Sequence, residues 1–424
     1  MHKGDLLAVK ATLCAKLAFG MLSLAAGWTV SPYDTSAALG SSCSSALYPL
    51  AERWDALWMA KAARCGYVHE QQLAFFPAFP LLAHSASFGL CPEIGGVLLA
   101  FVCQVACAPL VCSTARVASG NSNRVAAHAS AAWALNPAMP FFSSAYADAP
   151  FALLAFACMR LAMSEHIVLA AITALCGASL RSNGALLAAP LVACVIAGVR
   201  RRGLRRLKGV EVVKYILWLL CALSPALPSL LFQLYAVRLF CGESDWKQQP
   251  MWCPKESMGL LSLSLPYKYV QGRYWGLGFL SFWQLEQLPN IALGLPAIVI
   301  TANALLEAVY FYPLTMFTLG AFGDPSRKSR SHRTISETEA DAQAHVRHAA
   351  IIGVTAAWGV MGAAGALVMH VQVSTRMMSA WPPCIWYVAR RAARSERFAV
   401  RLHIFCGTYA AVGSVLFATF YPWT

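Results

Sequence analysis

Long apolar blocks are the feature of this sequence that most restricts its fold. Several of them run for about 20 residues without interruption, the length that an α-helix needs to cross a bilayer. Hydrophobic residues make up 58% of the chain and charged residues only 12%, against about 25% in a typical soluble protein. A soluble enzyme, a disordered chain and a small disulfide-stapled domain are therefore excluded. The sequence predicts an all-α polytopic membrane protein.

Positive charge gathers in short stretches between the apolar blocks. The net charge is +14, and residues 200–208 hold six basic side chains and no acidic one. Residues 390–401 hold five Arg and one Glu. Such clusters are typical of short cytoplasmic loops, so we interpret them as topology determinants and expect no nucleic-acid partner.

We predict about eleven transmembrane helices, all within one membrane domain that spans residues 1–424. The first apolar block is too long for a signal-peptide core, so we expect it to be a retained signal anchor. The predicted spans are 11–31, 93–115, 125–145, 149–163, 166–183, 184–199, 211–240, 289–311, 349–369, 376–389 and 399–420.

Counting spans from a cytoplasmic N-terminus predicts two long lumenal loops, 32–90 and 241–288. Both Arg clusters fall on the cytoplasmic side only if residues 75–90 do not form a full span. Pro77 and Pro80 support this, because each removes a backbone donor and interrupts a helix. The polar stretch 324–348 is predicted to be a disordered cytoplasmic linker.

The fifteen cysteines lie mostly inside apolar blocks, where they behave as small hydrophobic residues. Cys241 and Cys253 flank a polar lumenal turn, and both a disulfide and two free thiols remain open for this pair. The histidines are scattered, so we expect no metal site.

The few acidic residues near the membrane are the candidates for chemistry. Asp55 follows Arg53 and Trp54 just after the first span. The i, i+4 spacing of Trp54 and Trp58 predicts an amphipathic interfacial helix. The spacing alone favours an ordinary aromatic belt with solvated charges over a catalytic site.

Two further acidic candidates lie on the predicted lumenal side. Glu70 follows Tyr67 and precedes an aromatic, proline-rich stretch at 74–80. Asp148 stands alone at a helix end, where it is either a site residue or a helix cap. The cationic candidates on the same side suit a lipid phosphate or snorkel to the interface; they are Arg181, Arg273, His370 and Arg376. This convergence favours an enzyme acting on a lipid phosphate over a channel.

Five blocks of the chain, in the same order, resemble the PIG-V family of GPI mannosyltransferases (GPI mannosyltransferase 2). The first is RWDALWMAKAARCGYVHEQQLAFFPAFPLL, which begins at Arg53. The others are NPAMPFFSSAYADAPFALLAF (136–156), LRSNGALLA (180–188), QGRYWGLGFLSFWQLEQLPNIALGLP (271–296) and HVQVSTRMMSAWPP (370–383).

The resemblance implies a GT-C glycosyltransferase of the endoplasmic reticulum membrane with a lumenal active site. Such an enzyme transfers the second, α-1,6-linked mannose from dolichyl-phosphate-mannose to a GPI precursor, with inversion. It implies no cofactor beyond this donor substrate and, since no DxD motif is present, no metal. The need for a small accessory membrane subunit is left open.

The resemblance also assigns roles to individual residues. It makes Asp55 the general base and leaves two roles open for Glu70, which either orients the acceptor or shares the proton transfer. Asp148 is the third acid of the expected site and stands where the family usually has Glu. The residues expected to bind substrate are Trp54, Tyr67, Phe76, Gln271, Arg273, Trp275, His370, Gln372 and Arg376. Among these, Gln271, Arg273, His370, Gln372 and Arg376 are expected at the dolichyl phosphate.

Two alternatives remain at this point. One is a GT-C enzyme that uses the same donor on another acceptor, which the first-loop block disfavours. The other is a non-catalytic lipid transporter or scramblase, which predicts charges inside the spans rather than at their ends.

Overall fold

The computed structural model describes residues 3–33, 46–203, 207–242, 249–253, 265–311 and 335–423, with side chains from residue 343 in the last range. Within these ranges the chain forms helices and no strand. The longer helices are α1 (Lys3–Thr29), α5 (Pro92–Ala118), α6 (Asn123–Ala134), α8 (Asp148–Ala162), α9 (Ile167–Leu180), α10 (Ala188–Arg202), α11 (Gly209–Leu223), α12 (Leu227–Phe240), α14 (Leu288–Phe311), α16 (Ile335–Leu367), α18 (Pro382–Arg394) and α19 (Glu396–Ala418). The shorter elements are α2 (Tyr48–Ala51), α3 (Ala56–Cys65), η2 (Glu70–Ala74), α4 (Ala78–Ser85), α7 (Met139–Ser143), η3 (Ser182–Leu187), η5 (Ser224–Ala226), α13 (Pro266–Trp275), η6 (Leu285–Gln287) and α17 (Val373–Ser379).

Seven helical segments of the described chain are long and apolar enough to cross a membrane. This confirms an all-α polytopic membrane protein but not the number of eleven spans. The seven segments are Lys3–Thr29, Pro92–Ala118, Ser182–Arg202, Gly209–Phe240, Leu285–Phe311, Gln343–Leu367 and Glu396–Ala418.

The other four predicted spans are short helices, α6, α8, α9 and α18, of 12 to 15 residues. At 1.5 Å per residue they cover only about 18 to 22 Å of a hydrocarbon core about 30 Å thick. The predicted span 125–145 is interrupted where Asn136 Oδ1 accepts a hydrogen bond from the Ala138 amide, and the chain then turns into α7. Much of α8 is fully buried, so neighbouring helices rather than lipid surround it.

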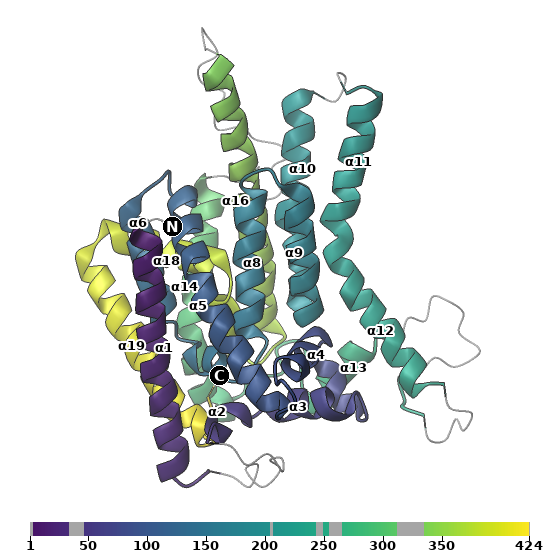
Figure 1. The fold of residues 1–424 in the computed structure, drawn as a ribbon, viewed down its shortest axis with the longest axis vertical. Coiled ribbons are helices and arrows are strands. Elements are labelled where there is room, and N and C mark those ends of the chain that lie inside the picture. The colour runs from purple at the N-terminus through teal and green to yellow at the C-terminus, as the bar shows by residue number, and fades with distance from the viewer. Residues whose placement is uncertain are drawn as a thin grey trace.

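The helices run back and forth between two ends of the bundle (Figure 1). The N-terminus, the α10–α11 connection and the start of α16 lie at one end, together with the α18–α19 turn. We call this the basic end, because it carries the Arg-rich stretches around 116–124, 200–208 and 390–401. Two ion pairs lie here: Arg116 of α5 pairs with Asp5 of α1 at 3.6 Å, and Arg201 of α10 pairs with Glu165, in the α8–α9 connection, at 3.5 Å.

The opposite end, which we call the site end, is covered by the short helices α2, α3, α4 and α13 (Figure 1). The prediction that residues 75–90 do not span the membrane is confirmed, because α4 has only eight residues. Helix α3 is fixed to α5 by an ion pair between Arg64 and the buried Glu93, at 2.6 Å. It ends at Gly66, whose φ of +73° suits glycine.

The structure corrects two predicted features and answers one question that the sequence leaves open. Trp54 and Trp58 do not share one helix: Trp54 has a φ of +53° and α3 begins after it, at Ala56. The predicted linker 324–348 lies partly outside the described residues, and from Ile335 onward it is the helix α16. Cys241 and Cys253 form a disulfide.

The arrangement predicts that the two ends of the bundle face opposite sides of the membrane. In a chain whose exposed thiols Cys14, Cys65 and Cys176 are replaced by Ser, single cysteines are placed at Asn123, on the basic end, and at Leu285, which is 87% exposed on the site end. With an impermeant maleimide, one cysteine reacts in sealed vesicles and the other only after permeabilisation. Labelling of both from the same side contradicts the arrangement.

Candidate active site

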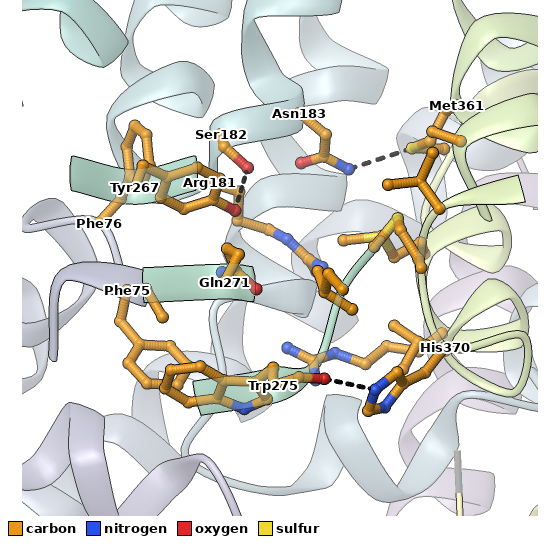
Figure 2. Close-up of a pocket in the computed structure, with 18 of the residues that line it drawn as sticks. Phe75, Phe76, Arg181, Ser182, Asn183, Tyr267, Gln271, Trp275, Met361 and His370 are labelled. Atoms are coloured by element: carbon orange, nitrogen blue, oxygen red, sulfur yellow. Dashed lines mark hydrogen bonds between the residues drawn. The ribbon is translucent and has the colours of Figure 1, made fainter. Parts of the chain in front are cut away.

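A cavity of about 740 Å³ opens at the site end of the bundle. Its walls come from the first loop, the α9–η3 junction, α13, the last turns of α16 and the segment 370–377. Figure 2 shows Arg181 near the centre of this cavity, with Phe75 and Trp275 on one wall and His370 on another. Segments that are far apart in the sequence thus contribute to one site.

Four charged side chains form a cluster at this cavity. Arg376 Nη1 lies 3.1 Å from Asp55 Oδ2, and Arg376 Nε lies 3.2 Å from both carboxylate oxygens of Asp148. Arg181 Nη1 donates to Asp148 Oδ1. Two carboxylates and two guanidinium groups thus balance, as charges withdrawn from water require. We call these four residues the charge cluster.

Local structure places both carboxylates at helix N-termini. Asp55 is the residue directly before α3, and Asp148 is the first residue of α8. The unpaired amide groups and dipole of a helix N-terminus stabilise negative charge there. Arg181 is extended between α9 and η3, and Arg376 lies on α17.

Arg376 lies in an aromatic surround. Its guanidinium group lies 4.8 Å from the ring centre of Phe141 and 4.7 Å from that of Tyr146. Burial acts to lower the pKa of Arg376, but Asp148 and Asp55 outweigh it and the pKa is raised. Arg376 therefore stays charged and holds the two carboxylates together.

The two carboxylates differ in access. The side chain of Asp55 is 30% exposed and lines the cavity, whereas that of Asp148 is fully buried and is not part of the lining. Only Asp55 can meet a substrate, while Asp148 fixes the positions of Arg181 and Arg376. Of the two acids in the charge cluster, Asp55 of the Arg-Trp-Asp motif is thus at the cavity, and Asp148 is buried behind it.

Arg53 anchors the backbone next to Asp55. Its Nε donates to the Ala418 carbonyl oxygen at 2.7 Å, which ties the first loop to the end of α19. The guanidinium group lies 4.4 Å from the ring centre of Tyr48 and 4.6 Å from that of Phe420. The Arg53 carbonyl accepts a hydrogen bond from the Tyr146 hydroxyl at 3.2 Å. Arg53, which the sequence analysis did not select, is a positioning residue.

His370 lies across the cavity from the aromatic wall. Its Nε2 lies 2.6 Å from the Trp275 carbonyl oxygen, and because that oxygen only accepts, Nε2 carries the proton. The imidazole stacks on Phe282 with ring centres 4.6 Å apart. Nδ1 is therefore the nitrogen available to a ligand.

The structure brings about half of the predicted site residues to one place. Those that line the cavity are Asp55, Phe76, Gln271, Trp275, His370 and Arg376. Glu70 and Tyr67 line a second cavity. Arg273 is exposed on α13 outside both cavities, Gln372 precedes α17 outside the lining, and Trp54 packs on Phe420 with ring centres 5.8 Å apart.

Other residues of the lining are not among the site residues predicted from the sequence. Arg181 was recognised only as one of several lumenal cations, and the block RSNG was the signal that marks it. Ser182 follows it and bonds the Tyr267 hydroxyl at 2.8 Å (Figure 2). Lys268, on α13, adds a further cation to the lining. No motif in the sequence around Pro266 and Tyr267 indicates that Lys268 belongs to the site.

No group of three or more His, Cys, Asp or Glu side chains gathers in the part of the chain that the structure describes. The cations at the cavity are instead side chains of Arg and Lys. The absence of a metal requirement stays a prediction.

The charge cluster predicts a large stability cost for Asp148→Asn. This change leaves two buried guanidinium groups with one carboxylate between them, which costs about 3 to 5 kcal/mol. We expect the apparent melting temperature in detergent to fall by at least about 5 °C, while Asp148→Glu stays closer to the wild type.

The matched control is Glu211→Gln, which breaks a 3.5 Å pair with Arg202 at a half-exposed surface. Such a pair contributes at most about 1 kcal/mol, so little change is expected. Equal melting temperatures for Asp148→Asn and Glu211→Gln would show that the cluster is not a structural constraint.

Comparison with known proteins identifies the family. The family described as Mannosyltransferase (PIG-V) matches residues 10–424. The GPI alpha-1,6-mannosyltransferase 2 of Cricetulus griseus is 28% identical over 397 residues, which cover 84% of this chain and 77% of that protein. The GPI mannosyltransferase 2 of Drosophila pseudoobscura pseudoobscura is 28% identical over 411 residues, covering 88% and 86%. The GPI alpha-1,6-mannosyltransferase 2 of Rattus norvegicus is 30% identical over 373 residues, covering 80% and 72%. No solved structure matches the chain. The chain belongs to the PIG-V mannosyltransferase family and is a membrane-embedded glycosyltransferase.

Proposed function

We propose that this enzyme transfers mannose from dolichyl-phosphate-mannose to a GPI precursor, in α-1,6 linkage and with inversion, on the lumenal face of the endoplasmic reticulum membrane. The names of its relatives, GPI mannosyltransferase 2 and GPI alpha-1,6-mannosyltransferase 2, support the acceptor and the linkage. Membership of a mannosyltransferase family speaks against a non-catalytic lipid transporter.

The observation that carries the proposal is the position of Asp55. It is the carboxylate of the charge cluster that lines the cavity, and Arg376 holds one of its oxygens at 3.1 Å. In the proposed step, the acceptor hydroxyl oxygen forms a bond to C1 of mannose as the bond from C1 to the phosphate oxygen breaks. The hydroxyl proton passes to Asp55, which acts as general base. Attack from the face opposite the phosphate converts a β-linked donor into an α-linked product.

The leaving phosphate gains negative charge as the bond to C1 breaks, and cations nearby stabilise it. Lys268, Arg181 and Arg376 line the same cavity. Of these, the two arginines are already paired with carboxylates, whereas no ion pair of Lys268 is found among the described residues. We therefore assign Lys268, together with His370 and Gln271, to the phosphate. This side-chain charge is why the mechanism needs no metal ion.

An apolar limb of the cavity suits the prenyl chain of the donor. Val360, Met361 and Ala364 of α16 line it, together with Val368 just after this helix and Leu186 of η3. The limb follows α16 into the membrane-spanning part of the bundle, so a lipid tail can remain in an apolar environment while its phosphate meets the cations.

Two observations support a lumenal site. The cavity lies at the site end, opposite the basic end that the positive-inside rule assigns to the cytoplasm. The disulfide between Cys241 and Cys253 also lies beyond the end of α12 at the site end, and disulfides persist in an oxidising compartment such as this lumen.

The proposal predicts that the wild-type chain restores GPI-anchored surface proteins in cells that lack the second GPI mannose. Asp55→Asn, which keeps the shape of the side chain but cannot take the proton, should lower the turnover number about 10²- to 10⁴-fold. The assay is transfer of labelled mannose in microsomes at equal enzyme levels. Failure of the well-expressed wild type to rescue would refute the function. Normal turnover by Asp55→Asn would refute only the choice of base.

The same assay tests the role of the cations. Microsomal activity should persist after treatment with excess EDTA, because no metal acts in the proposed step. Lys268→Gln should raise the KM for dolichyl-phosphate-mannose about tenfold, through loss of one charged hydrogen bond to the phosphate. Loss of activity in EDTA that Mg²⁺ or Mn²⁺ restores would contradict the metal-free mechanism.

A further inference from the structure

A second cavity, of about 490 Å³, opens beside the first and contains Glu70. Three separate segments form it: the first loop, the C-terminal end of α12 with Pro250 beyond it, and α13. The lining residues are Tyr67, Val68, His69, Glu70, Gln71, Leu239, Phe240, Pro250 and Tyr274. We call it the Glu70 cavity.

The carboxylate of Glu70 is held in a fixed orientation. Trp252 Nε1 donates to Oε2 at 2.9 Å, and the Tyr274 hydroxyl donates to Oε1. Trp252 is only 5% exposed and adjoins Cys253 of the disulfide, so the donor is rigidly placed. A carboxylate accepts about four hydrogen bonds, so two lone-pair directions remain for a ligand.

Tyr274 remains a donor at physiological pH. Desolvation and then the hydrogen bond to Glu70 raise its pKa to about 12, so the phenol keeps its proton. The carboxylate of Glu70 thus brings negative charge to the cavity, and the groups that donate to it, Trp252 and Tyr274, are neutral. Such a site disfavours a phosphate and favours a ligand that donates hydrogen bonds.

The remaining lining groups fit a sugar ring. The ring faces of Tyr67, Phe240 and Tyr274 offer apolar surfaces for the C–H face of a pyranose. Tyrosine also has one polar end, which suits a ligand that is partly exposed to solvent. His69 and Gln71 add a ring nitrogen and an amide that exchange hydrogen bonds with hydroxyl groups. A carboxylate, an imidazole, an amide and aromatic faces in one cavity are the groups that polyhydroxylated rings bind.

The Glu70 cavity shares a wall with the cavity of Asp55. The Tyr67 hydroxyl donates to the Phe75 carbonyl oxygen at 2.7 Å, and Phe75 lines the first cavity while Tyr67 lines the second. Tyr274 and Trp275 are consecutive residues of α13 that line one cavity each. A glycan of several rings can therefore place one ring on each side of this wall.

We propose that the Glu70 cavity binds a sugar ring of the acceptor glycan, one that lies outside the reacting ring, and that Glu70 accepts a hydrogen bond from it. The inference rests on the proposed function, because it concerns the acceptor of the same reaction. Glu70 is then a residue that binds and positions the acceptor, whereas the reacting hydroxyl meets Asp55.

The test is a kinetic comparison of Glu70→Gln with the wild type, with Glu286→Gln as the matched control. Glu286 is an exposed acid at the same end of the bundle and outside both cavities. The expected result for Glu70→Gln is an acceptor KM raised about tenfold, with the donor KM and the turnover number within about twofold of the wild type. Glu286→Gln should leave all three values unchanged.

A second pair of variants keeps the inference testable if Glu70→Gln does not fold. Tyr274→Phe and Trp252→Phe each remove one donor to Glu70 and keep the aromatic ring, and each should raise the acceptor KM alone. An unchanged acceptor KM in every variant that folds would overturn the inference. So would a fall in turnover at unchanged acceptor KM, because that result assigns Glu70 to the chemical step.

The assay itself separates the two failures. If the wild type transfers no mannose to a GPI precursor, the proposed function fails, whereas failure of the subsite leaves the wild-type transfer intact.

Discussion

The bridge that Arg376 makes between Asp55 and Asp148 is the contact on which the site depends. Charges removed from water are costly unless each has a partner, and here each of the three has at least one within 3.2 Å. The requirement fixes α17 against the starts of α3 and α8. Arg181 extends the same constraint to the α9–η3 junction. Four parts of the chain that are distant in sequence thus acquire one defined geometry.

The same cluster separates structural charge from reactive charge. Asp148 is fully buried and accepts hydrogen bonds from both arginines, so its charge serves to hold Arg181 and Arg376 in place. Asp55 pairs with Arg376 and is partly exposed at the cavity, where we propose that it meets the acceptor hydroxyl. Arg53 keeps this carboxylate in place from behind through the end of α19. The proposed base is thus oriented by Arg376 and by the anchored backbone of Arg53, while its carboxylate stays accessible from the cavity.

The sequence predicts those features that depend on hydropathy and loop charge, such as the two ends of the bundle and the short α4 after Pro77. It does not predict which charges pair, because Asp55, Asp148 and Arg376 lie in separate segments and only the packed helices bring them together. The helix expected to include both Trp54 and Trp58 does not form, because Trp54 has a positive φ, which the spacing of the residues does not reveal. The family resemblance groups Glu70 with Asp55, whereas in the structure they line two different cavities, which Tyr67 and Phe75 separate.

The short helices explain why the site lies where it does. The ends of α6, α8, α9 and α18 at the site end lie next to the segments 135–147, 181–187 and 368–381, in which irregular backbone flanks the short helices α7, η3 and α17. A 15-residue helix falls about 8 Å short of a hydrocarbon core about 30 Å thick, so this backbone is at membrane depth. Irregular backbone is tolerated there only where protein covers it or a polar cavity meets it. Asn136 illustrates the first case, since its side chain donates to the Ser379 carbonyl and caps Ala138. Arg181 illustrates the second case, in which the backbone meets a polar cavity, because it directly follows the end of α9 and lines the cavity. Shortened helices thus create a recessed polar site at this end of the bundle, where we propose that the lipid-linked donor enters.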